Sequence, residues 1–224
     1  MSENEIRKQI AVACGKMWWL GWVAANDGNL SVKLNNNSFL VTPSGISKSD
    51  VTPENVIKID ASGNTCSDSE HKPSSEFKMH LRCYAERDDV NAVIHAHPPC
   101  ATAFAVAGKP LDDYSIMETV LTIGSAPVAK YATPSTDEVG DSIAGLLQIH
   151  DALLLQNHGA LTVGCDLKTA FHRMETLEHS AKIVINANIL GGAKEIARPD
   201  IEELCSLRAR YGITGRHPGY KKYS

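Results

Sequence analysis

The chain has 224 residues, of which 43% are hydrophobic and 21% charged, an ordinary globular composition that excludes disordered and fibrous proteins. A formal net charge of −4 argues against a broad nucleic-acid interface, and no apolar run approaches the ~20 residues that a membrane helix needs. The first ten residues carry charges unlike those of a signal peptide, and the six cysteines contain no CxxC pair, so we expect reduced thiols and a cytoplasmic location.

The first half of the chain alternates predicted helices with short predicted strands. Apolar residues at three- and four-residue steps indicate an amphipathic helix from Glu5 to about Leu20. A hairpin is expected around the turn Asn35–Asn37. In chain order, the first half is expected to comprise a helix over 5–20, strands over 30–34, 39–41 and 56–59, a helix capped by Ser74 or Ser75 and ending near Glu86, and a buried strand over 90–94.

The second half contains the same mixture of short strands and longer helices. Several strands are joined by short turns, which favours an α/β protein with an antiparallel or mixed sheet covered by helices. No linker separates domains, so 1–224 is expected to be a single domain with a flexible tail from about residue 212. The expected elements are a short helix ending at Gly108, a strand edge at 127–129, a helix capped by Ser135 and ending at Leu147, paired strands over 151–156 and 160–163, a long helix over 167–189 and a last helix over about 201–211.

Two histidines lie where the buried strand ends. Residues two apart on a strand point to the same side, so His95 and His97 can both offer a ring nitrogen to one ion before Pro98 stops the strand. A third imidazole, His158, lies in the turn Asn157-His158-Gly159 after an apolar run. Three histidines at the mouth of a sheet predict a Zn²⁺ site with one open position. A purely structural HxH pair is the alternative.

Three turns made of small residues can present hydroxyl and backbone N–H groups to an anion. They are Asn-Asp-Gly-Asn at 26–29, Thr-Pro-Ser-Gly at 42–45 and Pro-Ser-Ser-Glu at 73–76. The third comes at a predicted helix start, where the helix dipole favours negative charge. Taken singly, each of the three is equally explained as a turn or a helix cap.

In combination these segments resemble the class II aldolase/adducin family. The resemblance covers nearly the whole chain, and it is greatest to bacterial sugar-phosphate aldolases of the L-fuculose-1-phosphate aldolase type. It implies a three-layer α/β/α fold around a mostly antiparallel sheet, and a homotetramer with active sites between subunits. The motifs occur in the order and spacing of the family: Gly28-Asn29-Leu30-Ser31, Thr42-Pro43-Ser44-Gly45, Pro73-Ser74-Ser75-Glu76, His95-Ala96-His97, Tyr131-Ala132-Thr133 and Asn157-His158-Gly159.

The resemblance assigns a role to each motif. Three histidines of the family bind a divalent metal, usually zinc with Mn²⁺ or another ion as the alternative, and they correspond to His95, His97 and His158. Glu76 corresponds to the catalytic acid/base, which also completes the metal shell when substrate is absent. Such a metal can polarise a ketone and stabilise the enediolate that C–C cleavage leaves, while Glu76 moves the proton. The substrate phosphate is held by residues that correspond to Gly28, Asn29, Ser44, Gly45, Ser74 and Ser75.

The position of the general acid matches the family pattern only approximately. In fuculose-phosphate aldolases a tyrosine from the neighbouring subunit protonates the leaving aldehyde, and Tyr114 lies in the corresponding region. The segment Met117–Gly124 looks more like aldolases that act on deoxy or methylthio pentulose phosphates. Tyr211, Tyr220 and Tyr223 near the C-terminus are the alternative candidates for this acid.

The resemblance therefore predicts a metal-dependent aldehyde-lyase. Its substrate would be a ketose 1-phosphate, either L-fuculose 1-phosphate or a related deoxypentulose phosphate, and its products dihydroxyacetone phosphate and an aldehyde. A dehydratase, decarboxylase or epimerase of the same fold is the alternative, because it would use the same histidines and phosphate turns. A non-catalytic adducin-like module has lost its metal ligands, whereas this chain retains all of them. Neither nucleic acid nor a membrane is expected as a partner.

Overall fold

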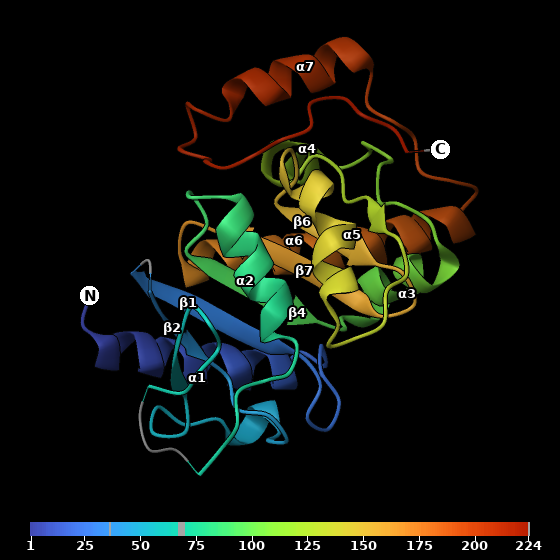
Figure 1. Ribbon diagram of the computed structural model, residues 1–224. Helices are drawn as coiled ribbons and strands as arrows, with labels where there is room; N and C mark the ends of the chain where they lie inside the picture. Colours follow the sequence, from blue (N-terminus) through green and yellow to red (C-terminus); the bar gives the residue numbers. More distant parts are fainter. Residues whose placement is uncertain (36, 67–69, 224) are drawn as a thin grey trace.

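A seven-stranded sheet runs through the middle of the protein, shown in Figure 1 as a computed structural model that describes residues 1–35, 37–66 and 70–223. The strand order is β3-β2-β1-β4-β7-β6-β5, and only the pair β5 and β6 is parallel. The predicted mostly antiparallel sheet is therefore confirmed. β1 and β2 form the predicted hairpin, whose turn includes residue 36, outside the described part of the chain. The bounds are β1 Asn29–Asn35, β2 Ser38–Val41, β3 Ile57–Asp60, β4 Ala92–Ala96, β5 Val128–Ala129, β6 Ala152–Leu155 and β7 Gly159–Gly164.

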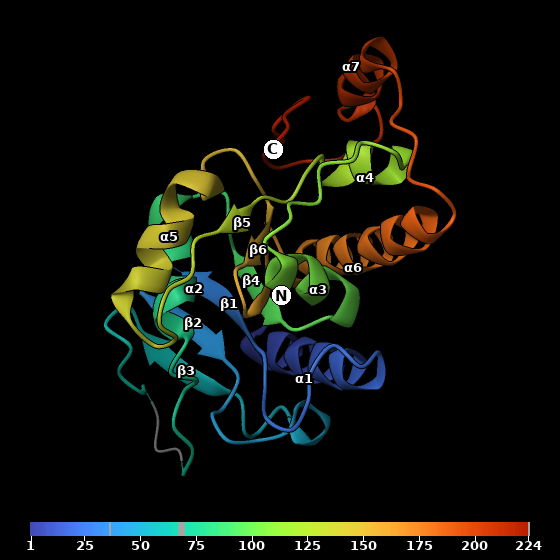
Figure 2. The same ribbon diagram turned by 90° about the vertical axis from the view of Figure 1, so that its right-hand side faces the viewer.

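Helices cover both faces of this sheet, so the molecule has the three layers expected (Figure 2). One hydrophobic core lies between the sheet and α1, α3 and α6, and a second lies between the sheet and α2 and α5. The 3-10 turn η1 packs against α1. The bounds are α1 Glu3–Trp19, η1 Lys48–Asp50, α2 Phe77–Glu86, α3 Pro99–Ala107, α4 Met117–Thr122, α5 Asp137–Leu147, α6 Leu167–Ile189 and α7 Arg198–Leu207.

Single residues set the ends of several helices. The Ser2 hydroxyl accepts a hydrogen bond from the Glu5 backbone N–H, and the Glu5 carboxylate accepts one from the Ser2 N–H, so α1 begins with a reciprocal cap. α3 ends at Gly108, whose φ of 64° is the left-handed conformation that glycine adopts without a Cβ penalty. Both boundaries lie within two residues of the predicted ones.

The predicted serine cap of α2 is wrong. This helix begins at Phe77, and the residue that flanks it is Glu76, whose side chain makes no capping hydrogen bond. The Ser74 N–H donates instead to the Thr42 carbonyl, at 3.3 Å, which ties the segment before α2 to the loop that follows β2. The two serines 74 and 75 therefore stay outside the helix, at the edge of the sheet.

Other boundaries differ from the predicted ones as well. Ser135 does not cap α5, which begins after Thr136; it has a φ of 66°, and its hydroxyl donates to the Ser75 hydroxyl. α7 ends at Leu207 rather than near Tyr211. α4 has no counterpart among the predicted elements, because its six residues are too few to show a helical period.

The last part of the chain packs beside α4. We call α4, α7 and residues 212–223 the C-terminal layer; Figure 1 shows α7 and the C-terminus together at the top of the molecule. A small core of Tyr114, Val120 and Ile201 holds it, and the Tyr220 ring stacks on Tyr114 with 5.1 Å between ring centroids. This layer is thus built from contacts between residues far apart in the sequence.

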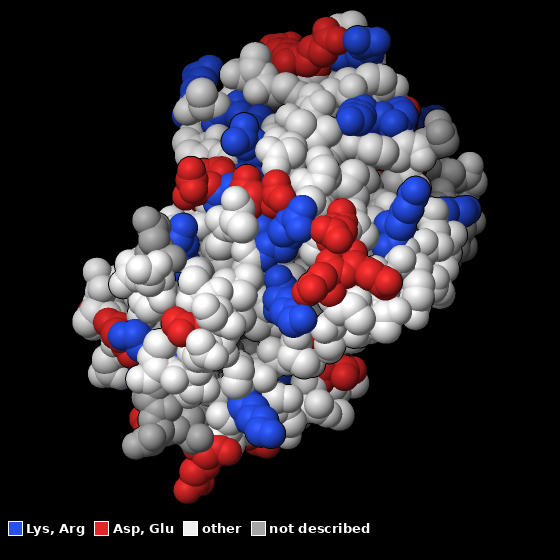
Figure 3. Space-filling view, in the orientation of Figure 1, with Lys and Arg blue, Asp and Glu red and all other residues white. Residues whose placement is uncertain are grey.

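The surface carries no single dominant charge on the side that Figure 3 shows. Acidic and basic side chains alternate there, without the broad basic field that a nucleic-acid backbone requires. Within the described part of the chain, no helix is both long and apolar enough to cross a bilayer.

Candidate functional site

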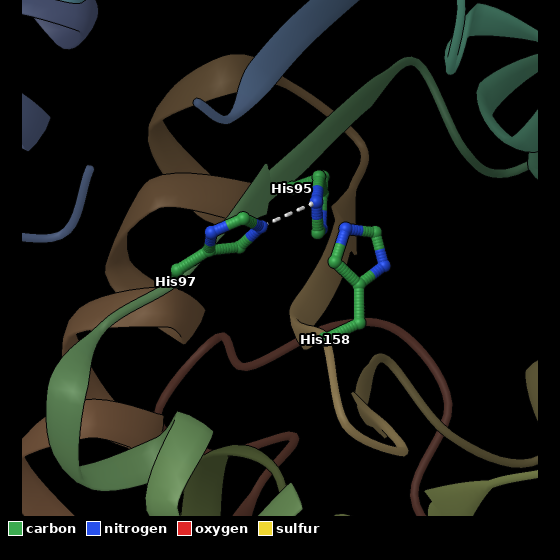
Figure 4. Close-up of side chains that lie close together, drawn as sticks. All are labelled: His95, His97 and His158. Carbon is green, nitrogen blue, oxygen red and sulfur yellow. Dashed lines mark hydrogen bonds between the residues drawn. The ribbon is translucent and has the colours of Figure 1, made fainter. Parts of the chain in front are cut away.

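Three histidines meet at one edge of the sheet. His95 is in β4, His97 follows that strand directly and His158 is in the turn between β6 and β7, and Figure 4 shows their rings turned toward one another. One ring nitrogen of each lies within 4.8 Å of the other two. His97 Nε2 is 3.1 Å from His95 Nε2. The structure thus brings together the three histidines that the sequence singled out.

Backbone pairing fixes the His95 ring. His95 pairs with Leu161 in the β4–β7 ladder, and its Nδ1–H donates to the Ala160 carbonyl at 2.9 Å. Because the proton is on Nδ1, the lone pair of Nε2 faces the other two histidines. The His95 ring is completely buried, so solvent water does not compete for its nitrogens.

The position of His97 is fixed by contacts to two other parts of the chain. Its backbone N–H donates to the Trp22 carbonyl at 2.8 Å. The helix that follows, α3, is held by Glu178 of α6, whose carboxylate accepts from the N–H groups of Cys100 and Ala101 at 3.0 and 2.8 Å. A carboxylate at a helix start is favourably placed against the helix dipole. These contacts fix the direction in which the chain leaves β4.

The turn that carries His158 depends on the residues on either side of it. Asn157 has a φ of 56°, a left-handed conformation that asparagine tolerates better than most residues. Gly159 follows, and a Cβ there would lie 2.5 Å from the Ala96 carbonyl oxygen and 2.5 Å from His97 Cδ2. Only glycine therefore lets the turn approach β4 closely enough to bring His158 to the other histidines.

Burial favours the neutral form of His95 and His97. The pKa of His95 is well below its usual value, first because the ring is desolvated and then because His158 and His97 lie close to it. Burial also lowers the pKa of His97, with the neighbouring His158 as the next cause. A neutral imidazole is the form that binds a metal ion.

A carboxylate faces the cluster from the residue before α2. Glu76 Oε1 is 3.3 Å from His158 Nε2, and Glu76 Oε2 is 3.6 Å from His95 Nε2. The Asn29 side-chain N–H donates to Oε2 at 2.7 Å and fixes the orientation of the carboxylate. Since this side chain does not cap α2, both of its oxygens are available at the edge of the sheet.

These donors fit a divalent metal ion such as zinc. Nitrogen ligands about 2.0–2.1 Å from a tetrahedral zinc lie roughly 3.3 Å apart, close to the observed 3.1 Å between His95 Nε2 and His97 Nε2. The hydrogen bond from His95 Nδ1 to a carbonyl is the kind of contact that orients metal-binding histidines. Glu76 is placed where it can supply a fourth donor.

A cavity of about 210 Å³ opens beside His97, His158 and Glu76. Pockets for drug-sized ligands usually measure about 300–1,000 Å³, so this one suits a smaller molecule. The three small-residue turns form its wall together with Pro134 and Ser135. Every residue that the resemblance assigns to phosphate lines it: Gly28, Asn29, Ser44, Gly45, Ser74 and Ser75.

Two backbone N–H groups in this wall already donate hydrogen bonds to carbonyls of the protein. The Ser44 N–H donates to the Lys72 carbonyl at 2.8 Å, and the Ser74 N–H donates to the Thr42 carbonyl at 3.3 Å. These two hydrogen bonds join the second and third turns to each other. An anion in the cavity would therefore have to be held by the serine hydroxyls and by other amides of the turns.

Tyr114 is not part of this cavity in its own chain. Its side chain is 2% exposed, and its hydroxyl donates to the Gly219 carbonyl and accepts from the Lys221 N–H, both at 2.7 Å. Its φ is 50°, and its ring belongs to the core of the C-terminal layer. A role for Tyr114 in the site of a neighbouring subunit stays a prediction.

Three further residues lie at or near the site without having been singled out as site residues. Asp27 Oδ2 is 3.6 Å from His97 Nδ1. The sequence could have indicated Asp27 as a site residue, because it lies in the first small-residue turn. Ser135 lines the cavity from the loop before α5. Lys48 is buried behind the first two turns. No local pattern marks Lys48, because its neighbours in the sequence are mostly polar and exposed or half-buried.

Comparisons with known proteins agree with this geometry. The model of a family described as the class II aldolase and adducin N-terminal domain matches residues 8–185. A 3-oxo-tetronate 4-phosphate decarboxylase of Pectobacterium atrosepticum is 31% identical over 91% of this chain and 94% of its own. A 5-methylthioribulose-1-phosphate/5-deoxyribulose-1-phosphate aldolase of Rhodospirillum rubrum is 32% identical over 97% of both chains.

A solved structure of an L-fuculose 1-phosphate aldolase has the same architecture. It superimposes with a TM-score of 0.84 and 31% sequence identity, over 92% of this chain and 97% of that one. The names of these three proteins give three different substrates, and each substrate is a phosphorylated sugar or sugar acid.

Proposed function

The chain belongs to the class II aldolase and adducin family, and we propose that it is a metal-dependent aldehyde-lyase. The proposed reaction is the reversible cleavage of a ketose 1-phosphate to dihydroxyacetone phosphate and an aldehyde. L-fuculose 1-phosphate or a related deoxypentulose phosphate would be the substrate. The observation that carries this proposal is the convergence of three imidazoles and one carboxylate beside a small cavity lined with serine and glycine turns.

His95, His97 and His158 would hold the divalent ion, with zinc as the first choice and Mn²⁺ as the second. When bound, such an ion acts as a Lewis acid that polarises a carbonyl group. Because the pKa values of His95 and His97 are lowered, these two ligands are neutral near pH 7. They therefore need not lose a proton before they bind the ion.

Glu76 would move the proton at the substrate carbon next to the carbonyl. Its two oxygens lie within 3.6 Å of His158 and His95, so a substrate held at the histidines would also be within reach of the carboxylate. Asn29 donates to one carboxylate oxygen and keeps the group turned toward the cavity. The same carboxylate would return the proton in the opposite direction of the reaction.

The cavity wall would hold the phosphate group of the substrate. Ser44, Ser74 and Ser75 line the cavity and would offer their hydroxyl groups to the phosphate. Anchoring the phosphate would fix the reacting carbon near Glu76, which converts binding energy into orientation. A ligand without a phosphate would lose this contribution.

We also propose that the enzyme is a cytoplasmic homotetramer with its sites between subunits. Tyr114 would then act as the general acid in a neighbouring site, with Tyr211, Tyr220 and Tyr223 as alternatives. In the isolated chain the Tyr114 hydroxyl is engaged by residues 219–221, so this role would require that segment to rearrange or to belong to the interface.

A panel of ketose 1-phosphates tests the proposal. Fuculose, rhamnulose, deoxyribulose and methylthioribulose 1-phosphates would be assayed by coupled detection of dihydroxyacetone phosphate, before and after dialysis against a chelator. We expect one of them to be cleaved, activity to vanish on dialysis, and added Zn²⁺ or Mn²⁺ to restore it. Full activity in the dialysed protein would contradict the metal-dependent reaction.

Decarboxylation is the second candidate function. It is favoured by the similarity to the 3-oxo-tetronate 4-phosphate decarboxylase, which extends over 91% of this chain. That reaction would use the same histidines and phosphate turns, with loss of CO₂ in place of an aldehyde. Silence across the ketose panel together with CO₂ release from a phosphorylated 3-oxo acid would establish this alternative. A dehydratase or epimerase would give neither signal.

A non-catalytic, adducin-like module is the remaining possibility within the family. Such a module would have no need to keep the histidines and the carboxylate in contact. In this chain all three imidazoles and Glu76 are within 4.8 Å or less of a neighbour in the cluster. A purified protein that neither binds a divalent metal ion nor turns over any of these substrates would support the module.

A further inference from the structure

A lysine ammonium is buried behind the cavity. Lys48 begins η1, and its side chain is among the most completely buried large side chains in the protein, with 1% of the residue exposed. Its Nζ donates to the Asn26 and Ile46 carbonyls, each at 3.1 Å. Among the described residues, no carboxylate forms an ion pair with it. Buried charges in proteins are normally paired, so an unpaired ammonium in this position requires a reason.

One of the two carbonyls belongs to the first small-residue turn, and the other directly follows the second. Asn26 begins the turn that contains Gly28 and Asn29, and Ile46 directly follows Ser44 and Gly45. Lys48 is therefore the link between two parts of the cavity wall that are not neighbours in the sequence. Without its ammonium, both carbonyls would lose a buried donor, and the turns would lose their common attachment.

The charge of Lys48 also reaches the site. Burial lowers the pKa of Lys48, and this is opposed by Cys14 and by two residues that line the cavity, Asp27 and Glu76. The ammonium in turn contributes to the lowered pKa of His95. It therefore adds positive potential at the cavity although its side chain does not line the cavity.

We propose that Lys48 is a positioning residue for the substrate phosphate, and that the bound phosphate adds to the negative charge that faces this buried ammonium. The proposal rests on the phosphate cavity of the proposed function. Lys48 would act in two ways: it holds the first two turns in the spacing that fits a phosphate, and it favours a dianion there through space. In a partly buried environment one such charge several ångströms away changes affinity by about tenfold or more.

The test measures binding of inorganic phosphate to the zinc-loaded protein by calorimetry. Lys48→Met removes the charge and keeps an unbranched apolar stem, while Lys168→Met removes an exposed lysine of α6 as the matched control. We expect Lys48→Met to weaken phosphate binding about tenfold or more with unchanged zinc stoichiometry, and Lys168→Met to leave both unchanged. Lys48→Arg, which keeps the charge, should retain most of the affinity.

A second readout separates positioning from a general loss of structure. The KM for a phosphorylated substrate should rise about tenfold in Lys48→Met while kcat changes little, and the affinity for an unphosphorylated analogue should stay the same. Equal losses on both ligands would mean that Lys48 only supports the fold. Phosphate binding by folded Lys48→Met as tight as in the wild type would also overturn the proposal.

The wild-type protein provides the check if Lys48→Met does not fold. The Lys48 ammonium is buried, so its ¹⁵Nζ signal should be observable by NMR, and phosphate should shift it while leaving the backbone amide signal of the exposed Lys168 in place. A Lys48 signal that does not move when phosphate binds would contradict the inference alone. If phosphate does not bind to the zinc-loaded wild type at all, the phosphate cavity itself is wrong, and the inference falls with it.

Discussion

Buried or half-buried histidines lie both at the sheet edge and at the C-terminal layer, but their nitrogens are used differently. At the sheet edge, His95 gives Nδ1–H to a carbonyl and turns Nε2 toward His97, His158 and Glu76. Near the C-terminal layer, His217 donates from Nε2 to the Val120 carbonyl and accepts at Nδ1 from a backbone N–H. A histidine with both nitrogens satisfied by its own fold is structural, whereas nitrogens that converge on one another are prepared for an added ion.

The second histidine beside the C-terminal layer repeats this pattern. His150 donates from Nδ1 to the Ser125 carbonyl at 3.1 Å, and its Nε2 contacts the Tyr223 hydroxyl. Burial lowers the pKa of both His150 and His217 to about 4. The low pKa is therefore common to the two regions and does not by itself indicate a site. The direction of the nitrogens does.

The largest expected effect comes from exchanging a histidine in each region. His158→Ala should weaken zinc binding by more than about 100-fold and abolish turnover, because it removes a ligand, with less than about 1 kcal/mol lost in stability. His217→Ala should leave zinc binding unchanged and lower the free energy of unfolding by about 1–3 kcal/mol, because two partly buried hydrogen bonds are lost. Metal titration and urea unfolding measure both. An equal loss of zinc affinity in the two variants would contradict the distinction between the two regions.

Gly159→Ala should damage the sheet edge through backbone packing. Its Cβ would lie 2.5 Å from the Ala96 carbonyl oxygen and 2.5 Å from His97 Cδ2, so we expect a loss of about 1–3 kcal/mol in stability together with weaker zinc binding. Gly145→Ala is the control, since a Cβ there meets nothing within 4 Å and the residue lies in α5. The control should gain up to about 1 kcal/mol. Unchanged zinc affinity in Gly159→Ala would separate the turn from the metal site.

Tyr114→Phe should affect the C-terminal layer without reaching the histidines. It removes a hydroxyl that bonds to Gly219 and Lys221, at a cost of about 1–2 kcal/mol in the free energy of unfolding. Zinc affinity should stay at the wild-type value. A fall in kcat at constant zinc affinity and constant KM would support Tyr114 as the general acid, and weaker zinc binding would show that the two regions are coupled.

The smallest expected effect near neutral pH is that of the pH on the free energy of unfolding. His150 and His217 have folded pKa values of about 4, below the unfolded value, so unfolding takes up one proton at each of them between these pH values. Stability is therefore fully present above about pH 6.5 and decreases toward pH 4, with a slope of up to about 1.4 kcal/mol per pH unit for each histidine. His150→Gln should flatten the slope measured by urea unfolding. An unaltered slope would remove His150 from this account.

Much of the sheet edge could be predicted from the sequence because its residues come from short motifs. His95 and His97 share one strand end, and their spacing alone indicates that they lie on one side. His158 was predicted as the third ligand because it lies in a turn after another apolar run, and the family resemblance assigned it to the same ion. The pairing of β4 with β7, which joins segments more than sixty residues apart, is what the sequence alone does not show. The sheet arrangement followed from the short turns between strands.

The C-terminal layer could not be predicted in the same way. α4 is only six residues long, and Tyr114 is held by residues more than a hundred positions later. Lys48 illustrates the same difficulty within the site, since nothing in its polar neighbourhood indicates a buried ammonium. Contacts between single side chains far apart in the sequence leave no periodic pattern, so only the folded chain reveals them.

Proton exchange on dihydroxyacetone phosphate tests the central claim most directly. The zinc-loaded protein is incubated with this compound in D₂O, and the loss of its C–H signal is followed by NMR for the wild type and for Glu76→Gln. We expect exchange in the wild type, none after zinc is removed, and a rate at least about 100-fold lower in Glu76→Gln with zinc still bound. Exchange that continues without zinc, or that is unchanged in Glu76→Gln, would contradict the assignment of the three histidines and Glu76 to one reaction centre.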